Sequence, residues 1–325
     1  MPLKPTLKRG ALIAAANWQI TLIQSVADSL FKLLIAAPVL GGVFLVALVF
    51  GAEPARLIEL DWRELITTIV GALLSHPIVL AAFLASLGIV ILGGSAFVFL
   101  VKGGTVATLV DGDRHAGPIE QPPLHLWVVA RAGRFSAERF IDSCSHLFAR
   151  FLRLGLLLMA LYLASGIIFY LSLWWTGGWG LVALFVALFV AWVTLVNLLY
   201  LLVQIVVATD DCSVAAGIRR VIAFVRAETR AIGAVFGVVL ALLVCATGAS
   251  ILATTALGLI AFVPFFGLAV LPLQLLAWLL RGIVFQFLGL TAIGAYLQLY
   301  RAYADRPAPR PVGDLASLGT NLITP

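Results

Sequence analysis

Charged residues are scarce in this chain, at 11% of its 325 residues, while hydrophobic residues make up 62%. Soluble domains average about 25% charged residues and about half apolar ones. The composition therefore excludes an ordinary soluble protein and indicates an integral membrane protein. It also argues against nucleic-acid binding, because the net charge of +6 is not gathered in a basic soluble domain with interleaved aromatic residues.

Cysteine and histidine are also rare, with three and four residues. Cys144, Cys212 and Cys245 are odd in number, and we expect none of them in an oxidising loop, which argues against a disulfide framework. The scattered histidines lack the close spacing of a metal motif. No catalytic constellation stands out, so the sequence predicts no active site and no metal site, and it leaves any cofactor unknown.

Long apolar stretches, in contrast, are abundant. A membrane-spanning helix needs about 20 apolar residues to cross a hydrocarbon core of about 30 Å. The stretches are continuous rather than alternating, which favours helices over a barrel. We therefore predict an all-α, polytopic transmembrane bundle with an uncleaved first span, six spans in all: residues 33–51, 77–101, 154–174, 180–207, 232–262 and 268–299.

Proline and glycine punctuate these stretches. We expect Pro38 and Gly41-Gly42 to break the first span, and Pro272 is a candidate break in the last. Residues 176–180 and 264–267 are predicted turns between neighbouring spans. Small-residue patches at Gly41-Gly42 and Gly93-Gly94-Ser95 permit close helix packing. Trp174, Trp175 and Trp179 are expected to form an aromatic belt at the membrane interface.

Basic residues show which way the chain lies in the membrane. Eighteen of the 21 fall in residues 1–32, 102–153, 208–230 and 301–325, which hold four, seven, four and three of them. The loop 52–76 holds only Arg56 and Arg63, against four acidic residues. Cytoplasmic loops carry the excess of lysine and arginine. We therefore expect a bacterial cytoplasmic (inner) membrane protein with both termini in the cytoplasm and basic surfaces that attract anionic lipid headgroups.

Three amphipathic segments precede pairs of spans: residues 17–32, 136–153 and 214–230. Each places apolar residues at helical spacing, and basic amphipathic helices beside a span are expected to lie in the interface plane. The chain therefore divides into three parallel repeats of an interfacial helix followed by a helical hairpin. The predicted units are residues 11–113, 114–212 and 213–305, followed by a Pro-rich tail, 306–325.

The ends of these units also resemble one another. Val106-Ala107-Thr108 precedes Asp111 and Asp113, and Val207-Ala208-Thr209 precedes Asp210 and Asp211. Asp210-Asp211 with Arg219-Arg220, and the six-span layout, resemble uncharacterised bacterial six-span membrane proteins. These are related to the membrane domain of glycerophosphodiester phosphodiesterases and to the YciC-like group. The resemblance implies the architecture of that family and no chemistry, because no phosphodiesterase domain is attached. Independently, the four aspartates are expected to cap helices.

Arg281 lies well inside the sixth predicted span, and no predicted span contains an acidic residue. A charge within the membrane is by default a hypothesis of function. Arg281 either binds an anionic group or snorkels to the outer headgroups. Arg219 and Arg220 are further candidate contacts for anions or lipids. Candidate intramembrane polar packing residues are Asn197, Gln204, Gln274 and Gln286.

The favoured interpretation is a non-enzymatic accessory or scaffold subunit that packs against other membrane proteins and organises lipids. One alternative is a permease or lipid transporter, in which Arg281, Asn197 and Gln204 line a polar path. Another is a membrane enzyme that uses the aspartates at the cytoplasmic face. The Pro-rich tail is either a docking strap for a cytoplasmic partner or an unattached end.

Overall fold

The computed structural model describes residues 3–49, 64, 67, 71, 74–121, 126–133, 135–174, 179–261 and 267–306. Within these ranges the chain is helical and forms no strand. Its helices are α1 (Leu3–Ala16), α2 (Trp18–Val49), α5 (Pro77–His115), α6 (Leu126–Ala132), α7 (Ala137–Trp174), α8 (Trp179–Thr209), α9 (Val214–Ala261) and α10 (Gly267–Ala304).

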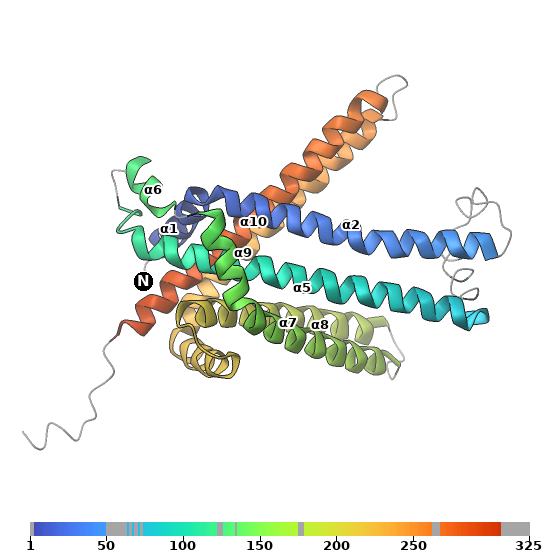
Figure 1. Ribbon diagram of the computed structural model, residues 1–325, viewed down its shortest axis with the longest axis horizontal. Helices are drawn as coiled ribbons and strands as arrows, with labels where there is room; N and C mark the ends of the chain where they lie inside the picture. The colour runs from blue at the N-terminus through green and yellow to red at the C-terminus, as the bar shows by residue number, and fades with distance from the viewer. Residues whose placement is uncertain are drawn as a thin grey trace, which may run out of the picture.

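Six helices are long and apolar enough to cross a membrane: α2, α5, α7, α8, α9 and α10. The predicted six-span helical bundle is thus confirmed. Helices α2, α5, α7 and α8 run side by side, whereas the tip of the α9–α10 hairpin diverges from them (Figure 1). Both α1 and the C-terminal part of α10 lie at one end of the bundle, which we call the terminal end; the other is the distal end.

Two of the predicted interfacial segments are not separate helices. Residues 17–32 and 136–153 are continuous with the spans that follow them, in α2 and α7. Helix α9, in contrast, is interrupted at Glu228, near the end of the third predicted segment, where a φ of −121° and a ψ of 28° leave the helical region. The predicted break at Pro38 is wrong, since α2 continues through it, and α10 also contains Pro272. Prolines are tolerated in membrane helices where neighbouring groups satisfy the freed backbone carbonyl.

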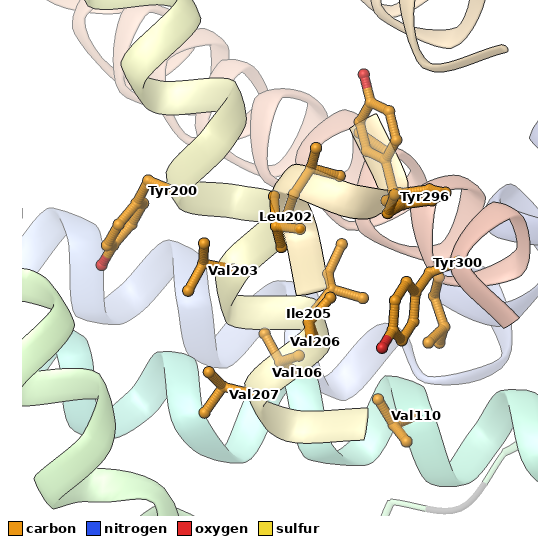
Figure 2. Close-up of a cluster of buried hydrophobic side chains, with 14 of the residues drawn as sticks. Val106, Val110, Tyr200, Leu202, Val203, Ile205, Val206, Val207, Tyr296 and Tyr300 are labelled. Atoms are coloured by element: carbon orange, nitrogen blue, oxygen red, sulfur yellow. The ribbon is translucent and has the colours of Figure 1, made fainter. Parts of the chain in front are cut away.

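The main core lies towards the terminal end, where five helices converge. Figure 2 shows side chains of α8 meeting those of α5 and α10, with Leu202 and Ile205 near Tyr296. Phe151 of α7 and Phe224 of α9 complete this cluster and are fully buried. Burying one such aromatic side chain contributes about 1.5–3 kcal/mol. The distal halves are far less buried inside the protein, as expected where lipid is the solvent.

Helix α1 was not predicted, and it is held by an unusually close contact with α10. A Cβ added to Gly294 would lie 2.8 Å from the Cα of Gly10, so the two backbones touch. Only glycine permits this approach. Ile13 and Ala14 on α1 are fully buried beside it. The N-terminal helix is therefore packed into the terminal end.

Glycines also set the packing between α2 and α5. A Cβ added to Gly42 of α2 would meet the ring of Phe83 on α5, and one added to Gly94 of α5 would meet the ring of Phe31 on α2. The contact is reciprocal, with each helix offering a glycine to a phenylalanine of the other. One glycine of each small-residue patch thus serves packing within the chain, whereas a Cβ added to Gly41 or Gly93 would meet no described atom within 4 Å.

Several predictions fall mainly outside the described residues. These are the loop 52–76, the turns 176–180 and 264–267, the tryptophan belt and the Pro-rich tail. The threefold repeat and the cytoplasmic position of the termini stay predictions.

Candidate functional site

Polar side chains gather in two places, and the first is an ion-pair network at the terminal end. Asp113 of α5 is only 3% exposed. One carboxylate oxygen accepts a hydrogen bond from Nε of Arg9 at 2.7 Å, and the other accepts from Arg301 at 2.5 Å. Asp113 therefore joins α5 to both α1 and α10.

Arg9 makes further contacts with the segment after α5. It donates to Oε2 of Glu120 at 2.9 Å and to the backbone oxygen of Gly117 at 2.6 Å. Burial alone would lower the pKa of Arg9, but the carboxylates of Asp113 and Glu120 outweigh it and raise that pKa. The guanidinium is thus permanently charged and fully engaged in holding helices together.

The aspartates after α8 are engaged in the same way. Asp210 accepts hydrogen bonds from Arg220 and, at 2.5 Å, from the Tyr300 hydroxyl. Asp211, at a φ of 47°, pairs with Arg150 and with His146 at 3.0 Å. Hydrogen bonds from Arg150 and then His146 lower the pKa of Asp211.

The expected helix-capping role of the aspartates is wrong. Asp113, Asp210 and Asp211 bind basic side chains, and Asp111 lies 3.2 Å from His115 in the next turn. Ser213 instead accepts a hydrogen bond from the N–H of Ala216 at the start of α9, at 3.4 Å. The carboxylates of Asp113, Asp210 and Asp211 each accept hydrogen bonds from two side chains. A helix cap would offer each of them a backbone N–H instead of these charged or polar donors.

The second polar region is a cleft between α2 and α10, with a volume of about 450 Å³. Its lining combines cations, hydroxyls, an amide and one carboxylate with aromatic side chains. We call it the α2–α10 cleft; its lining residues are Ser25, Asp28, Ser29, Lys32, Trp278, Leu279, Arg281, Gly282, Phe285 and Gln286.

Arg281 is the cation of this cleft without an ionic partner. Its guanidinium carbon lies 5.7 Å from the centre of the Phe285 ring. It forms no ion pair with any residue that the structure describes, whereas Lys32 binds Asp28 at 2.6 Å. The expectation that no span holds an acidic residue is corrected here, because Asp28 lies in the candidate span Trp18–Gly42.

The other predicted polar residues do not join Arg281, apart from Gln286. Asn197 accepts a hydrogen bond from the Tyr162 hydroxyl of α7 at 2.6 Å. Gln204 is 2% exposed in the main core. Gln274 is half-buried on α10 and does not line the cleft.

The two other predicted anion contacts differ from each other. Arg220 is engaged by Asp210, whereas Arg219 is exposed and forms no ion pair among the described residues. The sequence therefore predicted the same role for Arg219 and Arg220, whereas in the fold they have different surroundings.

Two interhelical contacts were missed. Gln24 of α2 donates to the Thr105 hydroxyl of α5 at 2.7 Å, and Lys102 lies 5.5 Å from the centre of the Tyr200 ring. The available signal was the interruption of an apolar stripe by Gln24, three residues before Ala27. Within the described ranges, no three histidine, cysteine or acidic side chains gather as metal ligands.

A third feature is apolar: a stripe of small residues along α9. Gly233, Gly237, Ala241, Cys245, Ala249 and Ala253 follow one another at every fourth position, and all are exposed. A Cβ added to Gly233 or Gly237 would have no neighbouring atom within 4 Å. Residues four apart form one ridge of a helix, so this α9 stripe is a row of small, exposed residues along one helix.

Comparison with protein-family models, with curated proteins and with solved structures finds no match to this chain.

Proposed function

We propose that this integral membrane protein is a non-enzymatic accessory or scaffold subunit that docks a partner membrane helix on α9. The observation that carries the proposal is the α9 stripe. Small residues at every fourth position let helix backbones approach closely in lipid, and such pairs cross at about −40°. In this chain the stripe lies on the hairpin whose tip diverges from the bundle (Figure 1).

The treatment of glycine elsewhere in the chain supports this proposal. Glycine costs helix stability relative to alanine, by roughly 1 kcal/mol. At Gly42 and Gly94 this cost is offset by packing, because a phenylalanine ring of the neighbouring helix lies against the glycine. Gly233 and Gly237 have no such neighbour among the residues that the structure describes. A partner helix would supply one.

The two rival functions have less support. A polar transport path needs Arg281, Asn197 and Gln204 together, yet the fold separates them. Arg281 lines the α2–α10 cleft, Asn197 binds Tyr162, and Gln204 is buried in the main core. A reaction at the terminal end needs carboxylates free to act, yet Asp113 and Asp210 are held by arginines and a tyrosine. We further propose the bacterial inner membrane as its location, with cytoplasmic termini, from the distribution of basic residues.

Cys245 provides a native probe of the stripe, because its thiol is exposed there. In a Cys144→Ala, Cys212→Ala background, thiol cross-linking in source membranes is expected to give one discrete product. Gly237→Leu should remove it, because a large side chain on the stripe keeps a partner backbone at a distance. Gly289→Leu is the matched control, since Gly289 on α10 is equally open but lies off the stripe.

Co-expression of two differently tagged copies identifies the partner. A product that contains both tags means a second copy of the chain, and a product with one tag means another subunit. Unchanged cross-linking in Gly237→Leu contradicts docking on the stripe.

A further inference from the structure

The α2–α10 cleft has the composition of an anion site. We propose that it binds a phosphate group at the membrane interface, with Arg281 as the principal contact. This inference does not depend on the accessory role of α9, because the cleft and the stripe lie on different helix faces and share no residue.

The first argument is the unbalanced charge of the lining. The cleft holds two cations, Arg281 and Lys32, and one carboxylate, Asp28. Lys32 and Asp28 pair at 2.6 Å, one helical turn apart on α2. Arg281 keeps a full positive charge with no ionic partner among the described residues. An arginine fork suits the oxygens of phosphate, which it binds through two parallel hydrogen bonds.

The second argument is geometric. The guanidinium of Arg281 lies over the ring of Phe285, four residues later on α10. This cation–π contact favours a guanidinium held against α10 at the side of the cleft. Ser25 and Ser29 present hydroxyl groups from α2, and Gln286 presents an amide from α10. A phosphate in the cleft can thus accept hydrogen bonds from both helices. The volume of about 450 Å³ falls within the usual range of ligand pockets.

The third argument is depth in the membrane. At 1.5 Å per residue, Arg153 and Trp174 lie about 31 Å apart along α7, close to the thickness of a hydrocarbon core. Phe99 of α5 packs on Gly155, beside Arg153, and Gly94 of α5 packs on Phe31, beside Lys32. Five residues of α5 separate these contacts, and the steps from Phe31 to Lys32 and from Gly155 to Arg153 add three more in the same direction. Lys32 therefore lies about 12 Å nearer the distal end than Arg153. Ser25, seven residues earlier on α2 and next to Gly282, lies within about 2 Å of the level of Arg153.

The end of the cleft formed by Ser25 and Gly282, next to Arg281, therefore lies near the border between apolar and charged residues, where the bilayer places its phosphates. Trp278 in the lining is a residue type that membrane proteins favour at this border. A cavity of similar volume between α7 and α8, about 420 Å³, is lined instead by leucine, phenylalanine and other mainly apolar side chains. Of these two, only the α2–α10 cleft offers cations to an anion.

The test measures binding of phosphatidic acid and phosphatidylglycerol to the purified full chain by native mass spectrometry, with phosphatidylcholine as the zwitterionic reference. We expect Arg281→Gln to weaken anionic lipid binding by about tenfold or more, because a hydrogen bond between charged groups is lost. Arg230→Gln is the matched control: it removes the same charge from an exposed site on α9 and should change binding less than about twofold.

A variant that gains affinity separates ligand binding from structural damage. Asp28→Asn removes the carboxylate that competes for Lys32, so it should tighten anionic lipid binding several-fold. Gly282→Val fills the cleft without a change in charge, since a Cβ there would lie 3.2 Å from Oγ of Ser25; it should weaken binding. Gly289→Val, in open space on the same helix, should not.

Inorganic phosphate distinguishes the two sources of the ligand. If millimolar phosphate displaces the lipid and binds alone, the site takes free phosphate; if it does not, the site takes a lipid headgroup. Either result supports a phosphate site. Equal lipid affinity in Arg281→Gln and Arg230→Gln, together with no gain in Asp28→Asn, overturns the proposal.

Discussion

The terminal end and the α9–α10 hairpin use the same small residues in opposite ways. At the terminal end, Gly10 and Gly294 bring two helix backbones into contact, and Asp113 receives two arginines. Along α9, Gly233 and Gly237 face open space. The difference shows that a glycine in a membrane helix packs within the chain only where a neighbour occupies it. Open glycines that recur with other small residues at every fourth position, as on the α9 stripe, are candidates for contacts between chains.

The largest expected effect lies at the terminal end. Asp113→Ala leaves Arg9 and Arg301 without their shared carboxylate, and removing one partner of a buried ion pair costs about 3–5 kcal/mol. The free energy of unfolding, measured by steric trapping in bicelles, should fall by about this amount. Asp111→Ala, at a more exposed position two residues away, is the control and should cost less than about 1 kcal/mol. Equal losses would contradict the difference in burial.

A second prediction compares filled and open glycines directly. Gly294→Val places a side chain against the Gly10 backbone, and overpacking of this kind costs about 1–3 kcal/mol or more. Gly233→Val meets no atom within 4 Å and should change the unfolding free energy by less than about 0.5 kcal/mol. Hydrogen exchange of α1 amides gives a second measurement, since only Gly294→Val should release α1. Similar stability of the two variants would remove the distinction.

The smallest expected effect concerns the exposed edge of the terminal end. The pKa of Asp211 is lowered in the folded protein, chiefly by the hydrogen bond from Arg150. A lowered carboxylate pKa stabilises the fold above the unfolded value of about 4, and this stability is lost as pH falls through the folded pKa. Because the side chain of Asp211 is 60% exposed, the pair should contribute less than about 1 kcal/mol.

A pH titration of stability checks this contribution. Asp211→Asn should remove the corresponding loss of stability below pH 4, while Asp305→Asn, an exposed control near the end of α10, should not. An unchanged profile in Asp211→Asn would show that the pair contributes nothing measurable.

The apolar runs predicted the spans because a bilayer imposes both a length and an apolar surface on each of them. Pro38 shows the limit of the rule that proline breaks a helix. That rule holds for helices in water, whereas in this chain the surrounding bundle and lipid favour an unbroken α2. The contact between α1 and α10 was beyond reach, because Gly10 and Gly294 gain meaning only when their helices are placed together.

The candidate site was predictable only in part. Arg281 stood out because a charge interrupts an apolar run. Asp28 and Lys32, which share its cleft, come from the opposite end of the chain, and no spacing in the sequence links them to α10. The four aspartates looked alike in the repeat pattern, yet Asp113 is buried and Asp211 is exposed. Burial is a property of the packed bundle, so aspartates that follow similar sequence motifs have different electrostatic surroundings.

The contact of α1 with α10 has a consequence for the order of assembly. Chains are synthesised from the N-terminus, so α1 is made before α10 and can pack in its place only after α10 has been made and inserted. Until then Arg9 and Asp113 lack part of their shared network, and Gly10 has no backbone to meet. A helix made late therefore completes the fold by fixing one made early.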